Sequence, residues 1–108
     1  ELKNKSFTTP GVLAKAGCQV SIITDSPVIP EQYLSLCAGL AVKNGMDEFD
    51  ALKAITINAA KHIGVSDRVG SIEIGKDADF VIAKGNPMIS ETKLDFVIID
   101  GVIRYSGK

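Results

Sequence analysis

Residues 20–27 of the sequence, VSIITDSP, decide the expected fold class. The run Val20–Thr24 is short, mostly apolar and β-branched, which is typical of a strand covered on both faces in a parallel sheet. The turn-forming cluster Asp25-Ser26-Pro27 ends this strand. Active sites of α/β sheets and barrels gather at the carboxyl ends of strands, so Asp25 is a candidate site residue. The residues alone favour a simpler role for Asp25, in which it starts the turn or caps a neighbouring helix.

Helices are predicted on both sides of this strand, from capping residues and from apolar residues at helical spacing. Proline can occupy the first turn of a helix, and glycine is favoured just after its end. Four helical stretches follow these signals: Pro10–Ala16 with Thr9 as N-cap, a helix from Pro30 to Asn44, one that begins after Asp47, and Ala59–Ile63 with Asn58 as N-cap.

The pattern changes to that of strands near residues 65–70, and the division 1–64 and 65–108 follows from this change. Strands are predicted over 70–74 and 78–83, with a turn at Gly75-Lys76-Asp77 between them. Residues 96–99 and 102–105 form a predicted hairpin, because Asp100-Gly101 supplies the positive φ angles of a type I′ turn. Helices followed by a block of strands indicate two packing environments in an α/β chain.

Composition sets the outer limits on function. The chain has 108 residues and a formal net charge of -1, which describes one small domain at most. The near-zero charge excludes the basic surface that nucleic acids or anionic membranes require, and no apolar run is long enough to cross a bilayer. With one histidine and two separated cysteines, a self-contained His/Cys zinc site is not expected. The cysteines are predicted to be buried thiols of a reduced, cytoplasmic protein.

The remaining chemistry-bearing residues have structural explanations. His62 is predicted in the last turn of a helix, where the helix dipole favours a partly charged imidazole without any ligand role. Lys76 and Asp77 are expected at a solvated turn. Gly75-Lys76 lacks the glycine spacing of a phosphate loop, and a single parallel strand makes a nucleotide-binding or receiver-like domain a weak alternative.

Four stretches in order nevertheless resemble one family over nearly the whole chain. They are Thr24-Asp25, residues 51–64 (ALKAITINAAKHIG), residues 70–82 (GSIEIGKDADFVI) and residues 97–101 (VIIDG). Together they resemble the C-terminal portion of metal-dependent amidohydrolases, closest to the imidazolonepropionase-related branch. Ala59 stands where family members often have proline, a difference that affects a helix start and not the chemistry.

The resemblance implies a (β/α)8 barrel with a small β-sandwich. Residues 1–64 would supply the last strand and helices of the barrel, and residues 65–108 the C-terminal share of the sandwich. By the same resemblance Asp25 is the strand-eight aspartate, which contacts a divalent metal, with zinc the expected ion, and accepts the proton of the hydrolytic water. The family's other metal ligands would precede Glu1, so this chain alone is expected to bind no metal tightly and to hydrolyse nothing.

The resulting hypothesis is a C-terminal fragment of a hydrolase that acts on cyclic amide-type C–N bonds of a small-molecule substrate. Whether the chain is itself an enzyme stays open. The alternative is a non-catalytic α/β interaction module that pairs through exposed strands. Under either hypothesis we expect a homo-oligomer or association through exposed strands, because an isolated barrel strand leaves an unpaired edge.

Overall fold

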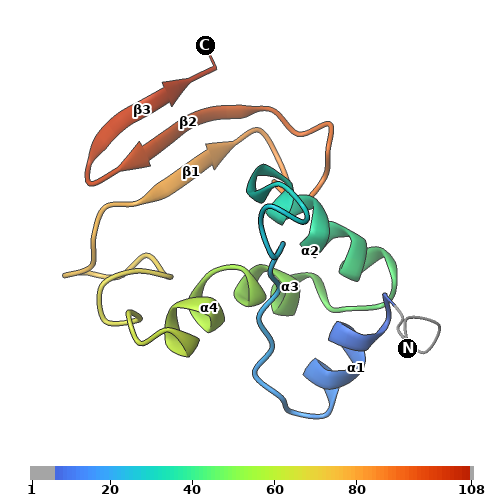
Figure 1. The fold of residues 1–108 in the computed structure, drawn as a ribbon. Coiled ribbons are helices and arrows are strands. Elements are labelled where there is room, and N and C mark those ends of the chain that lie inside the picture. The colour runs from blue at the N-terminus through green and yellow to red at the C-terminus, as the bar shows by residue number, and fades with distance from the viewer. Residues whose placement is uncertain (1–6, 108) are drawn as a thin grey trace.

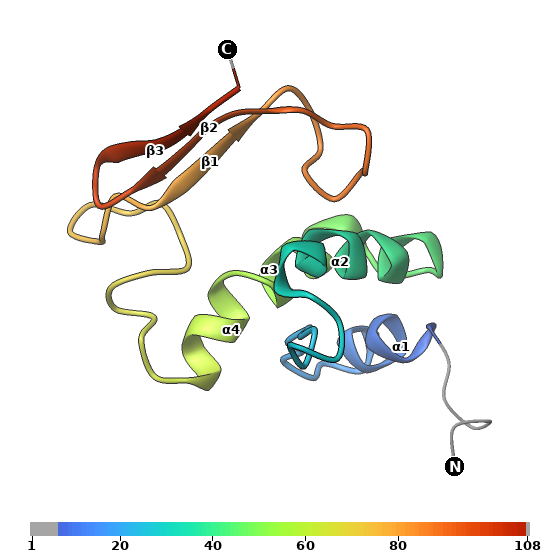
Figure 2. The same ribbon diagram turned by 45° about the horizontal axis from the view of Figure 1, so that its top comes forward.

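The computed structural model describes residues 7–107, which form a group of helices followed by a three-stranded sheet (Figures 1 and 2). The helices come first along the chain and lie together on one side of the molecule, and the sheet lies on the other. The elements are α1 (Thr9–Lys15), the 3-10 helix η2 (Glu31–Tyr33), α2 (Leu34–Lys43), α3 (Glu48–Ala54), α4 (Ile57–His62), β1 (Phe80–Ala83), β2 (Leu94–Ile99) and β3 (Val102–Ser106).

Among the helices of residues 7–107, α3 alone begins with a hydrogen bond to a capping side chain. Asp47 caps α3 as predicted, because its side chain accepts hydrogen bonds from the backbone N–H groups of Phe49 and Asp50, both at 3.1 Å. The prediction that Asn58 caps the last helix was wrong. Helix α4 begins at Ile57 with Thr56 as its N-cap residue, so Asn58 lies inside the helix and its side chain is available for another partner.

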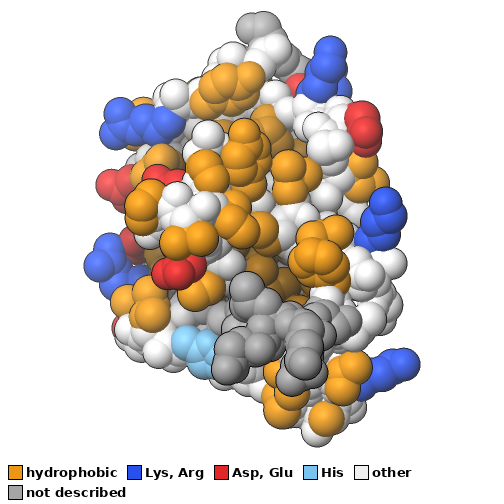
Figure 3. Space-filling view, turned by 45° about the vertical axis from the view of Figure 1, so that its right-hand side comes forward, with side chains coloured by type: hydrophobic (Ala, Val, Ile, Leu, Met, Phe, Trp, Pro, Cys, Tyr) orange, Lys and Arg blue, Asp and Glu red, His pale blue; other side chains and the backbone are white. Residues whose placement is uncertain are grey.

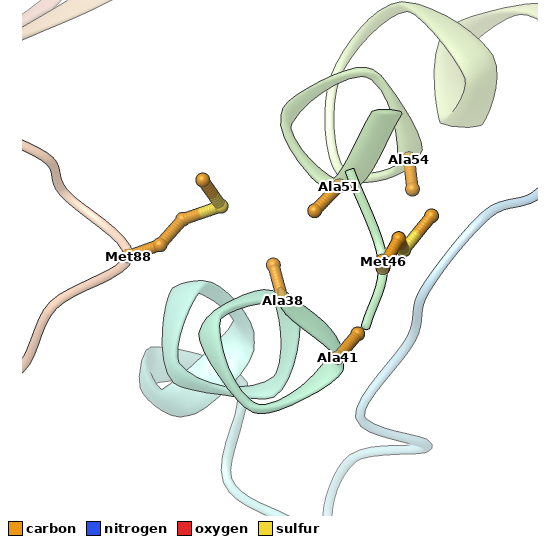
Figure 4. Close-up of a cluster of buried hydrophobic side chains, with 6 residues drawn as sticks. All are labelled: Ala38, Ala41, Met46, Ala51, Ala54 and Met88. Carbon is orange, nitrogen blue, oxygen red and sulfur yellow. The ribbon is translucent and has the colours of Figure 1, made fainter. Parts of the chain in front are cut away.

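The core is small and is made of alanine and methionine side chains (Figure 4). Alanines from α2 and α3 let the two helices pack closely, and Met88 reaches this core from the loop between β1 and β2. A residue from the strand-forming part of the chain therefore completes the core of the helical part. The buried cluster consists of Ala38, Ala41, Met46, Ala51, Ala54 and Met88.

The sheet is an antiparallel meander in the order β1-β2-β3. Its β2–β3 connection is the predicted Asp100-Gly101 turn, and both residues have positive φ, at 53° and 76°. These angles match a type I′ turn, which twists in the same sense as the strands it joins. The predicted hairpin is therefore confirmed, and the strand expected over 78–83 is present as β1.

Two other predicted strands do not form in the described residues. Residues 20–24 have no strand partner within 7–107, and the chain runs there without regular secondary structure. Residues 70–74 belong to a turn-rich connection, in which Ile72 and Ile74 are fully or almost fully exposed. A strand requires a neighbour for its ladder of hydrogen bonds, and neither segment has one here.

Much apolar surface remains exposed. Figure 3 shows hydrophobic side chains gathered in the middle of one face, and β3 is exposed along its whole length. The predicted burial of the cysteines was only partly right, since both thiols are unpaired but Cys18 is exposed and Cys37 half-buried. Among residues 7–107, none of the helices has the length and apolar character needed to span a membrane.

Candidate functional site

Asp25 lies in an exposed turn directly after a buried anchor. Thr24 is only 7% exposed, whereas the Asp25 side chain is open to solvent. The turn is closed by two backbone hydrogen bonds, from Val28 N–H to the Asp25 carbonyl at 2.9 Å and from Ile29 N–H to the Thr24 carbonyl at 3.2 Å. The carboxylate is thus presented at the surface by a backbone that is fixed on both sides.

The backbone of Asp25 adopts a conformation that few side chains tolerate. Its φ angle is 54°, in the left-handed region. Aspartate and asparagine enter this region more readily than other non-glycine residues, because their short polar side chains can bond locally. Such geometry is often found at functional sites, where the surrounding structure holds a strained residue in place.

Three hydrogen bonds hold the segment that leads to Asp25 against α3 and α4. The Asn58 side-chain amide donates to the Val20 carbonyl at 2.9 Å. The next two residues also bond to helices. Ser21 Oγ lies 2.5 Å from His62 Nδ1, and Ile22 N–H donates to the Ala54 carbonyl at 3.0 Å. Residues 20–22 are therefore each tied to a helix.

His62 has the location that the sequence predicted. It lies in the last turn of α4, is exposed, and bonds to Ser21. Within residues 7–107, the side chains of histidine, cysteine, aspartate and glutamate nowhere gather in a group of three that could hold a metal ion. In the described part of the chain, Asp25 thus belongs to no such group.

The groups with shifted pKa values lie in a different part of the chain. A hydrogen bond from the Ser71 hydroxyl lowers the pKa of Glu73, and Lys76 adds to this effect through its own contact with the carboxylate at 3.1 Å. The ion pair between Arg68 and Asp77, at 2.7 Å, raises the pKa of Arg68. These contacts stabilise the 68–77 connection, in which Lys76 is mostly buried and not the solvated residue that was expected.

A hollow of about 340 Å³ opens near Val20, at the start of the segment that leads to Asp25. Asp25 is not among the residues that line it. It is bordered by residues 17–20 and by side chains of α3 and α4, with Lys53, Lys61 and Asp50 at its polar margin. The hollow and the candidate carboxylate are therefore separate features of the chain.

Comparison with known proteins agrees with this arrangement. The model of the amidohydrolase family matches residues 3–108. The chain belongs to the amidohydrolase family. This amidohydrolase chain is related to imidazolonepropionases, as the four sequence stretches indicated.

Its relatives include imidazolonepropionases of Thermoplasma acidophilum and Thermoplasma volcanium. They are 37% and 40% identical to the amidohydrolase chain over 81 residues, which make up 73% of this chain and 20% of each relative. The chain thus spans about a fifth of the length of these curated relatives.

Two solved structures share the fold of the amidohydrolase chain. An amidohydrolase from Thermotoga maritima MSB8 superposes with a TM-score of 0.90 at 40% identity, over 97% of this chain and 27% of that chain. A Xaa-Pro dipeptidase with methionine bound in its active site gives a TM-score of 0.77 at 32% identity, over 94% and 25% of the two chains. The α/β arrangement with a small three-stranded sheet therefore fits part of an amidohydrolase fold.

Sequence reasoning missed the contacts of Asn58 and Ser21 in this amidohydrolase chain. Asn58 was assigned to a helix cap, and its partner Val20 lies 38 residues away in the sequence. A polar side chain near the start of a short helix fits a cap as well as a distant contact, so the residues offered no signal that separates the two.

Proposed function

We propose that this chain is the C-terminal part of a longer metal-dependent hydrolase that opens cyclic amide-type C–N bonds in a small molecule. The observation that carries the proposal is the amidohydrolase match over residues 3–108, in which Asp25 ends the segment 20–24 and is held exposed at positive φ. The relationship to imidazolonepropionases supports a cyclic substrate. We also propose that the hydrolase is a cytoplasmic protein.

The proposal also assigns the two parts of the chain. Residues 1–64 supply the last strand and helices of a (β/α)8 barrel, and residues 65–108 supply the C-terminal share of a β-sandwich. The segment 20–24 would then gain strand neighbours along the side that faces away from α3 and α4. The support for this arrangement is the superposition on the Thermotoga maritima amidohydrolase over 97% of the chain.

The donor set of this chain fits a metal only in part. Asp25 offers an exposed carboxylate, and carboxylate oxygens are common ligands of Zn²⁺ and other divalent ions. One carboxylate does not hold such an ion, so we propose that further ligands come from residues outside this chain. A bound divalent ion would supply Lewis-acid polarisation and a more acidic water.

The role of Asp25 follows from its chemistry and its position. An ionised carboxylate accepts a proton from the attacking water and returns it to the nitrogen that leaves when the C–N bond breaks. Thr24 is buried and two backbone hydrogen bonds close the turn, so the backbone that carries the carboxylate is held in place during this transfer. A fixed base avoids the entropy loss of ordering it at each turnover.

The test is Asp25→Asn in the full-length protein that contains this chain. Asparagine keeps the shape and the tolerance for positive φ but is a far weaker base, so kcat should fall by about 10²- to 10⁴-fold. Asp100→Asn is the matched control, because Asp100 is also exposed and has almost the same φ, 53° against 54°. Near-normal turnover by Asp25→Asn would remove this residue from the mechanism.

A substrate panel tests the bond that is cleaved. Five-membered cyclic amides and imidazolones should be hydrolysed, and Xaa-Pro dipeptides, which the name of the second solved relative suggests, should not. Turnover of the dipeptides alone would overturn the cyclic-substrate proposal while leaving hydrolysis itself in place.

We further propose that the chain associates through its sheet edges. In the order β1-β2-β3, the strands β1 and β3 are the edges, and β3 is exposed throughout. Unpaired edge strands offer N–H and C=O groups to another chain. Light scattering should show dimers or larger species, and a clean monomer would contradict this association. If the chain is instead a non-catalytic pairing module, it should associate without any turnover.

A further inference from the structure

We infer that Asn58 is a positioning residue for Asp25, acting through the backbone of residues 20–24. This inference rests on the proposed function of Asp25. The Asn58 side chain bonds to Val20, and its effect is to fix the segment that leads to the Asp25 carboxylate.

Among the three bonds, the one from Asn58 is both partly buried and made by a side chain, so a substitution can test it. It is half-buried, whereas the contact between Ser21 and His62 is exposed. Water can replace an exposed hydrogen bond at little cost, but a half-buried carbonyl that loses its donor has a poorer substitute. The bond from Ile22 to the Ala54 carbonyl involves only backbone atoms, so no side-chain change removes it directly.

The segment is also packed against the core, which allows the bond to determine position. Val20 and Ile22 lie partly buried against the alanine and methionine cluster, and Thr24 is buried. The hydrophobic effect is nearly non-directional, so burial alone defines the position of a segment along its axis less sharply than a hydrogen bond does. A hydrogen bond to a defined carbonyl fixes the register, since its geometry weakens steeply on misalignment. Asn58, together with the backbone bond from Ile22 to Ala54, thus sets how far along its axis the segment presents Asp25.

The same bond couples two parts of the chain that the sequence separates. Asn58 is the second residue of α4, and α4 follows α3, whose last residue supplies the carbonyl for Ile22. Both contacts therefore come from the junction between α3 and α4, residues 54–58, called the helical corner below. A shift of this corner displaces residues 20–22 together, and the turn that begins at Thr24 moves with them.

The experiment uses the full-length, metal-loaded protein and the variant Asn58→Asp, which keeps the shape but replaces the donor with an acceptor that repels the Val20 carbonyl. The new charge lies in the first turn of α4, where the helix dipole favours it, so the helix itself is not the target. We expect kcat to fall by about 10- to 100-fold with KM nearly unchanged, the range typical of displacing a catalytic group or its supporting partner. Asn58→Ala, which adds no charge, should change kcat in the same direction.

Asn44→Asp is the matched control. The Asn44 side-chain amide also donates to a backbone carbonyl, that of Leu40 at 2.8 Å, but this bond is local to the end of α2. Asn44→Asp adds the same negative charge and removes the same kind of amide donor, but it should leave kcat unchanged. Equal losses in both variants, or an unchanged kcat in Asn58→Asp, would overturn the inference.

Hydrogen exchange gives a readout that does not depend on activity. The amide of Ile22 bonds to the Ala54 carbonyl, next to the Asn58 bond, and the amides of Val28 and Ile29 bond within the turn at Asp25. In Asn58→Asp these amides should exchange faster than in Asn44→Asp. Unchanged exchange at all three amides would contradict the positioning role even if activity fell.

A double variant separates this inference from the proposed function. If Asn58 acts through Asp25, then Asn58→Asp should cost little further kcat in an Asp25→Asn background, because effects of residues that act as a unit are not additive. If Asp25→Asn retains activity, the proposed function fails. If Asp25→Asn loses activity but the losses of the two variants simply add, the positioning role fails and the function of Asp25 stands.

Discussion

Gly39→Ala should destabilise the protein, although the same change usually stabilises a helix. Gly39 lies in the middle of α2 with an ordinary helical φ, where alanine is favoured over glycine by about 1 kcal/mol. However, a Cβ at this position would press into the Met88 carbonyl oxygen, well inside van der Waals contact, and would lie 3.3 Å from the carbonyl carbon. The sign of the effect therefore depends on whether the Met88 backbone can withdraw.

Met88 has little freedom to move. Its side chain is 5% exposed within the core, and its N–H is bonded to the Asn86 side chain at 2.9 Å. Overpacking a fixed site costs about 1–3 kcal/mol, and a backbone neighbour places this case near 3. Subtracting the helix gain of about 1 leaves a net loss of about 2 kcal/mol. In urea this lowers the unfolding midpoint by about 1 M.

The assay is urea unfolding followed by circular dichroism, with Gly11→Ala as the control. Gly11 is also in a helix, but its added Cβ would lie 3.0 Å from Met46 Cα, so Met46 would have to move by only a few tenths of an ångström. Gly11→Ala should change the midpoint much less than Gly39→Ala. A Gly39→Ala protein as stable as the parent, or more stable, would refute the close packing of Met88 on α2.

Two further predictions concern local interactions. Asp47→Ala removes the side-chain cap of α3 and should cost about 1 kcal/mol in urea unfolding, whereas Asp47→Asn should retain most of the stability. Ser71→Ala should raise the pKa of Glu73 towards its ordinary value, which an NMR titration of the carboxyl group measures. Because the pKa of Glu73 is depressed in the folded protein, its contribution is present above the unfolded pKa and is lost as the pH falls through the folded pKa. In Ser71→Ala this loss should be smaller and should be complete at a higher pH, and an unchanged titration would contradict the role of the hydroxyl.

Features set by neighbouring residues were predictable from the sequence. The Asp100-Gly101 hairpin formed as expected because the turn angles depend on those two residues, and the cap at Asp47 follows from two bonds, to the residues two and three positions later. The two missing strands show where this reasoning stops. Residues 20–24 and 70–74 have strand-like patterns, but a strand also needs a partner, which a pattern within one segment does not reveal.

In the candidate site, too, local features were predictable and long-range contacts were not. The residues alone placed Asp25 at the end of a strand-like run, and only the family resemblance gave it a role. The contact from Asn58 spans 38 positions and joins a helix to a segment without regular structure. Capping preferences even pointed away from it, because asparagine is a favoured cap and Thr56 took that place. Long-range contacts of polar side chains depend on how elements pack, which is settled after their local structure.

The exposure of residues around Asp25 bears on which proposed function is right. Ile22 is partly buried and Thr24 is buried, whereas Ile23 between them is 73% exposed, so residues 22–24 alternate like a strand with one covered face. Val28, just beyond Asp25, is 75% exposed. Apolar side chains on both sides of a fixed carboxylate favour further protein there, because exposed apolar surface is costly and marks interaction sites. A module that pairs only through the edges of its sheet would not need this surface, since β1 and β3 belong to a different part of the chain. The apolar surroundings of Asp25 therefore favour the longer hydrolase over the pairing module.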